Sequence, residues 1–282
     1  MPADLHCHTK ISDGSTVLED IITLAKSRRL TAISVTDHDT LAGVTRARVL
    51  GERFGVKVVP GVEFSCCDNK RNRKVHLLAY LFTYPDRLEG LCRRTSEARK
   101  KASLQKISKI RRFYPITTEM VVRTASGSTN IYEQHIMHTL MHAGYACEVF
   151  GDLYDKLLDP ENGSCFIPTE YPDVFEVLEL LKSAEAVTVL AHPSLYDSME
   201  LLDELIAAGL DGVEVWHPCN TPEDTEILER KAKEHGLLRT GGSDFHGMYS
   251  ARPIHIGECT MPDDCLAELY TYKEKKHKPE KK

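Results

Sequence analysis

Short apolar runs alternate with helix-like stretches along most of this 282-residue chain. The apolar runs are rich in β-branched residues and fall at residues 3–6, 31–36, 56–62, 75–82, 187–191, 212–216 and 237–240. Helical patterns occupy residues 17–28, 41–54, 173–184, 198–208 and 223–235. Strands that are apolar almost throughout are typical of buried parallel sheets, and their alternation with helices predicts right-handed βαβ units. We therefore expect an α/β fold with parallel strands.

One segment, residues 86–168, breaks this alternation because it carries few strand signals. It has the pattern of a long helix over residues 88–112, a connection, and a second helix over about residues 130–143. We predict that 86–168 is a lid-like helical insertion domain on one side of a barrel domain formed by residues 1–85 and 169–270. The last residues, 271–282, end in the run KEKKHKPEKK and are expected to form a solvated charged tail.

The composition argues against several classes of protein. No apolar run approaches the roughly 20 residues of a membrane span, and the N-terminus lacks the basic start and apolar core of a signal peptide. The nine cysteines are odd in number, which argues against a secreted disulfide framework. We therefore expect a cytoplasmic protein with no membrane partner. The net charge of −6 argues against a general nucleic-acid binder.

Histidine and carboxylate side chains recur at the ends of the predicted strands. They are His6 and His8, Asp37 and His38, Glu63, His192, and Asp244 with His246. His76 is the exception, because it lies near the start of its strand. In a parallel α/β barrel the carboxyl ends of the strands meet at one mouth, so residues far apart in the chain can converge there.

These residue types suit a site for transition metals. Neutral imidazole and carboxylate oxygen bind zinc, manganese and iron, and the sequence does not choose among these ions. His6 and His8 are two residues apart, so both side chains face the same side of a strand, and Asp244 and His246 repeat that spacing. A single H-x-H pair is weak evidence, since a buried histidine is more often hydrogen-bonded within a core. Five such clusters at strand ends together indicate a metal centre.

The motifs that carry these residues are D-L-H-C-H, T-D-H-D, G-V-E, L-A-H-P and G-S-D-F-H. In this order they resemble the motifs of the PHP (polymerase and histidinol phosphatase) superfamily of phosphoesterases, and the resemblance covers roughly residues 1–82 and 185–260. It implies a distorted (β/α)7 TIM-like barrel and a centre of three divalent metal ions. The S-D-G segment at Asp13 is similar to the branch of the family that acts on nucleotide-type phosphates.

The resemblance also implies how three ions would share the ligands. The first ion would be held by His6, His8, Glu63 and Asp244. A second ion, bridged by Glu63, would be held also by His76 and His192. The third ion would be held by Asp13, His38 and His246.

The activity implied by the resemblance is hydrolysis of a phosphate ester by a metal-bound hydroxide, because clustered divalent ions activate water and neutralise phosphoryl charge. Two residues are candidate catalytic groups. His192, or a metal-bound water, could protonate the leaving oxygen. Asp37 lies next to a proposed ligand and could orient an imidazole, or it could cap the following helix.

Cationic groups are expected on the substrate side of the site. Arg99 belongs to the basic stretch 93–112 and could contact phosphate, with a solvated basic face as the alternative. Arg252 follows the last motif closely, and a guanidinium suits phosphate.

His135 matches a histidine of the nucleotide-phosphatase branch and is a candidate substrate contact or a packing residue. Glu133 stands where those relatives carry arginine, so this chain departs from their phosphate contact.

The sequence thus predicts a metal-dependent phosphoesterase that acts on a small phosphorylated metabolite, with a nucleotide such as a 3′,5′-bisphosphate as the leading substrate. A 5′→3′ exonuclease on short RNA or DNA and a histidinol-phosphate phosphatase are the alternative enzymes. A catalytically silent metal-binding regulatory domain is the non-enzymatic alternative, but such a domain should have lost ligands that this chain keeps. The oligomeric state stays open.

Overall fold

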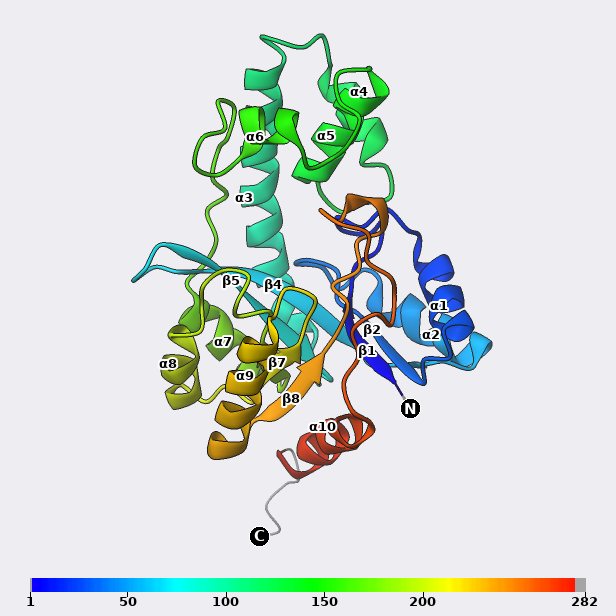
Figure 1. Cartoon of the computed structure of the whole chain (residues 1–282), viewed down its shortest axis with the longest axis vertical. Coiled ribbons are helices and arrows are strands. Elements are labelled where there is room, and N and C mark those ends of the chain that lie inside the picture. Colours follow the sequence, from blue (N-terminus) through cyan, green and yellow to red (C-terminus); the bar gives the residue numbers. More distant parts are fainter. Residues whose placement is uncertain (1, 277–282) are drawn as a thin grey trace.

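The computed structural model describes residues 2–276, and its strands form two sheets (Figure 1). The first sheet has the strand order β1–β2–β3 and is parallel. The second has the order β4–β5–β6–β7–β8. The strands are Ala3–Cys7 (β1), Ala32–Val35 (β2), Lys57–Val58 (β3), Gly61–Asp68 (β4), Arg73–Tyr80 (β5), Val187–Leu190 (β6), Gly212–Trp216 (β7) and Leu238–Gly241 (β8).

The two sheets meet at single bridges instead of merging into one ladder. Cys7, at the end of β1, forms a parallel bridge with Phe245, which follows β8. His38, which follows β2, forms a parallel bridge with Glu63 in β4. The expected α/β class with parallel pairing is confirmed. Within residues 2–276, however, continuous strand pairing does not close the predicted (β/α)7 barrel.

The second sheet departs from the parallel arrangement that the sequence predicts. β5 pairs antiparallel with both β4 and β6, whereas β6, β7 and β8 are parallel. The predicted strand 56–62 is divided at Pro60, which has no N–H to donate, and β4 continues to Asp68. Glu63 therefore lies inside a strand and not at its end. Because β5 runs antiparallel, His76 near its start lies at the same rim as the ends of the parallel strands.

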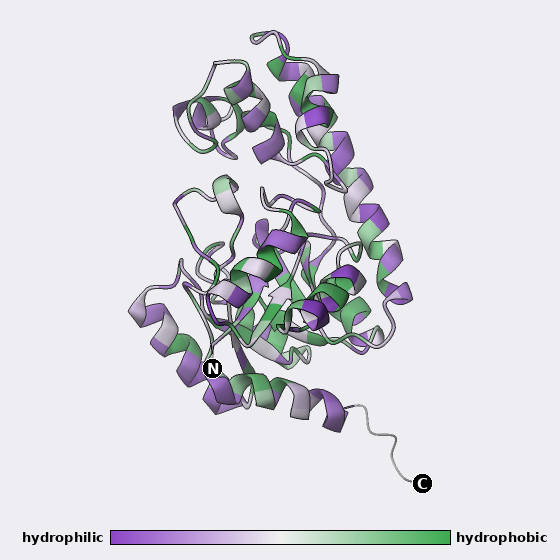
Figure 2. Ribbon diagram, turned by 90° about the vertical axis from the view of Figure 1, so that its right-hand side faces the viewer, coloured by the Kyte–Doolittle hydropathy of each residue, from purple (hydrophilic) through white to green (hydrophobic). Residues whose placement is uncertain are grey.

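Amphipathic helices cover the outer faces of both sheets, and the hydrophobic residues concentrate in the body around the strands (Figure 2). α1 and α2 pack on the first sheet, and α7, α8 and α9 pack on the second. These helices are Leu18–Ser27 (α1), Val44–Phe54 (α2), Val174–Ser183 (α7), Leu201–Ala207 (α8) and Pro222–His235 (α9). Among residues 2–276, none of the helices combines the length and hydrophobicity that a membrane span requires.

A further core lies between the two sheets and contains side chains from both. Leu5 of β1, Leu78 of β5 and Val189 of β6 are fully buried there. The helix α10, Asp263–Lys276, closes this core with Cys265 and Leu269. Burial of a large apolar side chain contributes about 1.5–3 kcal/mol, so this core joins the sheets more strongly than the two bridges do.

Residues 271–276 do not form the predicted charged tail. They continue α10, and Tyr272 and Lys276 both bond the buried carboxylate of Asp211. The prediction was wrong for these six residues because an amphipathic helix with a lysine-rich last turn looks like a charged tail in sequence. Residues 277–282 lie outside the described residues.

Residues 86–168 form helices, as the sequence predicts, and they stand at the top of the molecule in Figure 1, opposite α10. The helices are Asp86–Ile110 (α3), Thr118–Thr124 (α4), Glu133–His142 (α5) and Asp152–Leu158 (α6). They share a hydrophobic core of their own, which includes Ile107, Ile136 and Leu157. α3 runs from this core down to the body, where Leu88 and Leu91 join the core of the second sheet.

Candidate metal centre

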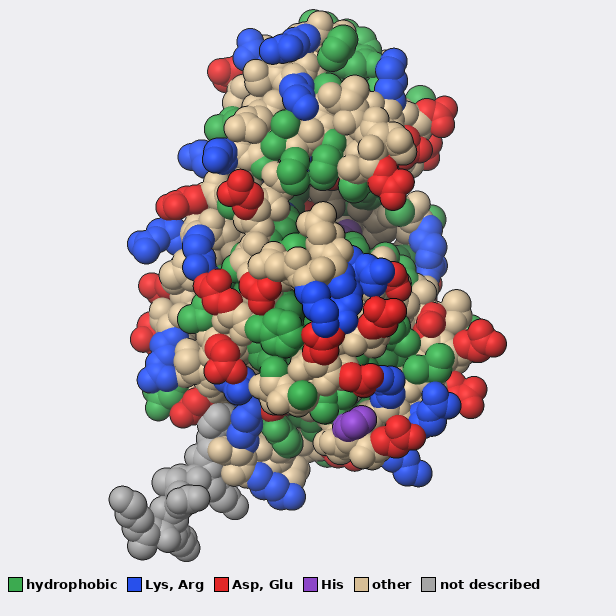
Figure 3. All heavy atoms as spheres, turned by 90° about the vertical axis from the view of Figure 1, so that its left-hand side faces the viewer, with side chains coloured by type: hydrophobic (Ala, Val, Ile, Leu, Met, Phe, Trp, Pro, Cys, Tyr) green, Lys and Arg blue, Asp and Glu red, His purple; other side chains and the backbone are tan. Residues whose placement is uncertain are grey.

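Nine histidine and carboxylate side chains from both sheets converge beside the ends of the parallel strands. Figure 3 shows the corresponding face of the molecule hollowed between the upper helices and the body, with a histidine inside the hollow. The nine residues include every metal ligand that the sequence predicts. They are His6, His8, Asp13, His38, Glu63, His76, His192, Asp244 and His246.

Four of them form one compact group around an oxygen of Glu63. The Nε2 atoms of His6 and His8 lie 3.1 and 3.0 Å from Glu63 Oε2. The same two nitrogens lie 3.4 and 3.2 Å from Asp244 Oδ1. All four ligand atoms are close enough to surround one ion, and these are the residues predicted to hold the first ion.

The other oxygen of Glu63 faces a second pair of histidines. Glu63 Oε1 lies 2.6 Å from His76 Nδ1 and 2.9 Å from His192 Nε2. The two imidazole nitrogens are 3.3 Å apart. One carboxylate therefore faces both groups, which is the arrangement that a bridging ligand requires.

A third group surrounds Asp13, on the loop after β1. Its carboxylate oxygens lie 3.4 Å from His246 Nε2 and 3.7 Å from His38 Nε2. His8 Nδ1 is 3.6 Å from Asp13 Oδ1, so His8 stands between the first and third groups. Gln134, from α5 of the insertion, donates to Asp13 Oδ2 at 3.2 Å. The insertion thus contacts the third group directly.

The protein itself leaves several of these buried atoms without hydrogen bonds. Among the described residues, no partner satisfies Nε2 of His6, either nitrogen of His8, Glu63 Oε2 or Asp244 Oδ1. An unpaired buried polar atom is costly, so a buried set of this size indicates bound ions. Two ligands on one tetrahedral zinc ion lie about 3.4 Å apart, and most separations within the first and third groups are near that value. The donor set therefore fits divalent metals.

The electrostatics of the cluster favour the metal-binding states of Glu63 and His76. Burial opposes ionisation of Glu63, but the imidazoles of His38, His76 and His6 hold the pKa of its carboxyl well below its usual range. Burial lowers the pKa of His76 to about 3, which keeps this imidazole neutral. Carboxylates and neutral imidazoles are the forms that coordinate cations. Nearby carboxylates raise the pKa of His6 and, to about 10, that of His8, so metal binding would displace protons from these two rings.

Comparison with known proteins assigns the family of this chain. The family model described as the PHP domain matches residues 4–152, more than half of the chain. The chain belongs to the PHP family. This confirms the resemblance that the sequence motifs indicate.

Three relatives of known name and one solved structure match nearly the whole chain. The phosphoribosyl 1,2-cyclic phosphate 1,2-diphosphodiesterase of Eggerthella lenta is 36% identical over 91% of this chain and 98% of that protein. A 5′-3′ exoribonuclease of Haemophilus influenzae is 27% identical, covering 86% and 89% of the two chains. A 3′,5′-nucleoside bisphosphate phosphatase of Chromobacterium violaceum is 26% identical over 86% of this chain and of that protein.

The solved structure is that of a metal-dependent phosphoesterase from Bifidobacterium adolescentis. It superposes with a TM-score of 0.86 at 32% identity and covers 95% of both chains. Together with the PHP match and the histidine–carboxylate groups, these similarities identify the chain as a metal-dependent phosphoesterase.

Local backbone geometry places the last PHP motif against the first. Gly242 lies so close to β1 that a Cβ atom there would come within 2.4 Å of the backbone nitrogen of His6. His192 and Asp244 adopt positive φ values of 24° and 50°. Such strained backbone persists where the surrounding structure fixes it, and here it directs two predicted ligands into the cluster.

Asp37 does neither of the things that the sequence suggests. It accepts hydrogen bonds from Thr9 N at 2.8 Å, from Thr9 Oγ1 at 2.7 Å and from Ser12 Oγ at 2.6 Å. The following helix α2 begins only at Val44, so Asp37 is not its cap. Ser12 also donates to Asp13 at 3.2 Å. The interpretation as an orienting group for an imidazole was therefore wrong, and Asp37 fixes the loop that carries Asp13.

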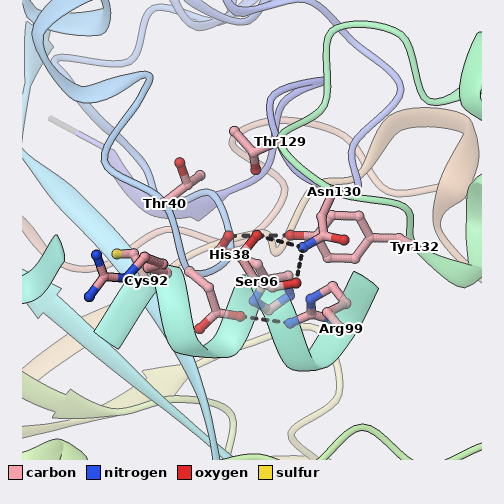
Figure 4. A pocket seen from close by; sticks show the side chains of 10 residues that line it. His38, Thr40, Cys92, Ser96, Arg99, Thr129, Asn130 and Tyr132 are labelled. Atoms are coloured by element: carbon pink, nitrogen blue, oxygen red, sulfur yellow. Dashed lines mark hydrogen bonds and ion pairs between the residues drawn. The ribbon is translucent and has the colours of Figure 1, made fainter. Parts of the chain in front are cut away.

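Arg99 is buried beside the metal cluster, in a pocket of about 210 Å³ that His38 also lines (Figure 4). Its Nη2 donates to Asp39 Oδ2 at 2.6 Å and to Ser65 Oγ at 3.0 Å. The guanidinium lies over the ring of Tyr132, 4.5 Å from its centroid. The alternative of a solvated basic face was therefore wrong for Arg99.

Arg252 lies away from this pocket. Its side chain is about half exposed and bonds Glu258 and the carbonyl oxygen of Pro218. Both contacts hold the surface loop after the last motif. The structure therefore gives no support to Arg252 as a phosphate contact, because proximity in sequence to the motif does not turn the side chain toward the ions.

His135 and Glu133 lie on the first turn of α5. His135 is buried, and its Nδ1 accepts a hydrogen bond from the backbone N–H of Tyr132, which caps the helix. Glu133 forms an ion pair with buried Lys106 and accepts a hydrogen bond from Tyr154 at 2.9 Å. At the position where the family resemblance implies an arginine, this chain has a carboxylate that joins α3, α5 and α6.

Two residues of the centre were missed by the sequence analysis. Glu214 of β7 bonds His6 Nδ1 at 2.9 Å and accepts the backbone N–H of His192 at 2.8 Å. His217 follows β7 and lies 3.4 Å from Asp244 Oδ2. A glutamate inside an apolar strand was the visible signal for the first. His217 could have been found from its position directly after a strand, which is also the position of His192.

Proposed function

We propose that this protein hydrolyses a phosphate ester on a small phosphorylated ribose compound, using three divalent ions. The observation that carries the proposal is the cluster around Glu63, in which several buried nitrogens and oxygens lack partners among the described residues. The first ion would take His6, His8, Glu63 and Asp244. The second would take Glu63, His76 and His192, and the third would take Asp13, His38 and His246.

Bound divalent ions supply activated water near neutral pH and neutralise the charge of a phosphoryl group. The chain's own residues then serve distinct purposes. Glu214 orients the ring of His6 through its Nδ1, and Asp37 holds the loop of Asp13. Partners of this kind typically alter metal affinity or activity by about 10- to 100-fold when they are removed. We keep His192 as a candidate proton donor as well as a ligand.

The substrate class is supported by what the relatives act on. The names of the three relatives describe a phosphoribosyl cyclic phosphate, RNA and a nucleoside bisphosphate. All three carry phosphate esters on ribose. The most similar of them in identity and coverage is the one named for the cyclic phosphate. This supports a small phosphorylated ribose, with a nucleoside 3′,5′-bisphosphate as the second candidate.

We further propose that residues 86–168 form a lid domain over a barrel-like domain of residues 1–85 and 169–270. The separate hydrophobic core of the insertion supports this division. Arg99 and His135, both buried in the lid helices, are proposed substrate contacts. Arg99 is the better supported, because its Nε has no partner among residues 2–276 and its pocket adjoins His38.

The decisive experiment is a substrate panel with protein loaded with manganese, zinc or iron. The panel contains phosphoribosyl 1,2-cyclic phosphate, adenosine 3′,5′-bisphosphate, a 5′-phosphorylated RNA trimer and histidinol phosphate. We expect the highest kcat/KM on one of the first two compounds and loss of turnover after chelation. Undiminished turnover by the chelated protein would exclude the metal mechanism, and preference for the trimer would favour an exonuclease.

The division into three ions has its own test. Asp13→Ala should remove one ion of three and leave the other two. Asp13 is the one carboxylate ligand of the proposed third site, where it lies between His38 and His246. Elemental analysis of the purified variant by mass spectrometry measures this directly. Loss of all the ions together would mean that the three groups form a single site.

A further inference from the structure

His217 is a buried histidine of the centre that has no place in the predicted ligand set. It directly follows β7, and its side chain is only 1% exposed. Its ring lies 5.2 Å from that of His192 and 6.1 Å from that of His6, measured between centroids. Its Nε2 therefore belongs to the same cavity as the proposed ions.

The backbone fixes which nitrogen of His217 carries the hydrogen. The N–H of Cys219 donates to His217 Nδ1 at 3.1 Å. A nitrogen that accepts a hydrogen bond presents its lone pair, so the hydrogen of the neutral ring is on Nε2. His217 therefore presents an N–H, and not a lone pair, to the centre.

Two of the proposed ligands, His6 and His246, have the opposite tautomer. His246 Nδ1 lies 2.8 Å from the carbonyl oxygen of Asp244, which can only accept, and His6 Nδ1 lies 2.9 Å from the carboxylate of Glu214. In both rings Nδ1–H is the donor, and Nε2 keeps its lone pair for an ion. The contrast separates His217 from these two ligands.

The N–H of His217 is not satisfied by the protein. Among residues 2–276, Nε2 has no hydrogen-bond partner, and the nearest carboxylate oxygen, Asp244 Oδ2, is 3.4 Å away. Hydrogen bonds from N–H to oxygen are normally 2.7–3.2 Å long. A buried donor without a partner is unfavourable, so an acceptor brought by a ligand would satisfy it.

A fourth metal site on His6, Glu214 and His217 does not fit these contacts. Both oxygens of Glu214 are already engaged, one by His6 Nδ1 and one by the backbone N–H of His192. The third ligand atom of such a site, His217 Nε2, carries a hydrogen. His217 Nε2 can therefore donate a hydrogen bond, but it cannot coordinate an ion together with Glu214.

We propose that His217 donates its Nε2–H to an oxygen of the substrate's phosphoryl group, on the Asp244 side of the metal centre. This inference rests on the proposed function, since it assumes a phosphate ester in the cavity. It adds a substrate contact directly after β7, in the barrel-like part, to the contacts proposed for the lid. His217 would raise affinity for phosphate without holding a metal.

A pair of substitutions tests this role. The amide of Gln can place an N–H near the position of His Nε2, whereas the amide of Asn reaches only the position of Nδ1. We expect His217→Asn to weaken binding of inorganic phosphate to the manganese-loaded protein by about 10-fold and to lower kcat/KM by about 10- to 100-fold. His217→Gln should restore most of both. His235→Asn, at the exposed end of α9, is the matched control.

Metal content, phosphate affinity by calorimetry and the thermal midpoint are measured on the same preparations. Full metal content with weak phosphate binding in His217→Asn, restored in His217→Gln, supports the proposal. Loss of an ion in both variants would overturn it, because His217 would then be a ligand or only a support for Asp244. Unchanged phosphate affinity in His217→Asn would also overturn it.

The two proposals can fail separately. If the wild-type protein hydrolyses none of the phosphate esters, the proposed function fails, while the phosphate titration still reports on His217. If the wild type is active and His217→Asn matches it in phosphate affinity and in kcat/KM, only the role of His217 fails.

Discussion

A single hydrogen-bond partner at Nδ1 decides what each of four histidines can do. A carbonyl or carboxylate acceptor beside Nδ1 frees Nε2 for an ion, as at His6 and His246. A backbone N–H beside Nδ1 leaves Nε2 as a donor, as at His135 and His217. The residue type is the same in all four cases, so the difference in role lies in hydrogen bonds that depend on local chain geometry.

At the same scale, His135 predicts a pH dependence of stability. Burial lowers the pKa of its imidazole to about 4, whereas an unfolded histidine titrates near about 6.5. Between these values the unfolded chain binds a proton that the folded chain does not, so folding stability falls as pH decreases from about 6.5 to 4. We expect His135 to contribute a loss of up to about 3 kcal/mol across this window.

Urea unfolding of the metal-free protein at pH 7.5 and 4.5 measures this loss. His135→Asn keeps an acceptor for the N–H of Tyr132 and removes the titrating ring. The variant should therefore lose less stability than the wild type on acidification, and the other titrating groups cancel in the comparison. Equal losses in the two proteins would show that His135 is protonated in the fold.

At the scale of elements, the insertion is held together by an ion pair as well as by its apolar core. Lys106 of α3 is buried, and its partner Glu133 of α5 is also bonded by Tyr154 of α6. Three helices therefore meet at one carboxylate. Removing one partner of such a pair leaves an uncompensated buried charge, which costs more than the pair contributes.

Substitution at Glu133 should destabilise the insertion more than the body. We expect Glu133→Ala to lower the free energy of unfolding by about 2–4 kcal/mol, because Lys106 keeps its charge without a partner. Glu133→Arg, which introduces the residue that the family resemblance implies, should be at least as damaging. Hydrogen exchange of α3, α5 and α6 locates the effect.

The double variant Lys106→Met/Glu133→Gln is the control, because it removes both charges. It should recover most of the lost stability. If Glu133→Ala alone is as stable as the wild type, the pair does not hold the helices together.

At the scale of the whole molecule, the proposed ions lie where the two sheets meet. His6 comes from the first sheet and Glu63 from the second, and His38 bridges to Glu63 across the junction. An ion bound by residues of both sheets would stabilise their junction, where continuous strand pairing is absent among the described residues. Metal binding and folding should therefore be coupled.

Chelation should lower the thermal midpoint of the protein. A ligand present at about 1,000 times its dissociation constant stabilises the folded state by about 4 kcal/mol per site, so removal of the ions should shift the midpoint by several degrees or more. Differential scanning calorimetry with and without EDTA measures the shift, and readdition of manganese or zinc should reverse it. An unchanged midpoint would indicate that the sheets are joined without the ions.

The alternation of elements, the helices of the insertion and the identity of the clustered histidines and carboxylates could be predicted from the linear chain. These features depend on periodicity, residue type and local motif, which a linear chain carries directly. His6, His8, Glu63 and Asp244 could be grouped in this way, through the PHP resemblance, before any fold was known.

The antiparallel direction of β5, the role of Asp37 and the separation of Arg252 from the centre could not be predicted and became evident only from the fold. It also brought in Glu214 and His217. Each of these depends on which distant segments pair, or on which backbone group faces a side chain, and local spacing carries neither. The physical reason is that a side chain's role is set by its partners in space, and those partners are chosen by packing of the whole chain.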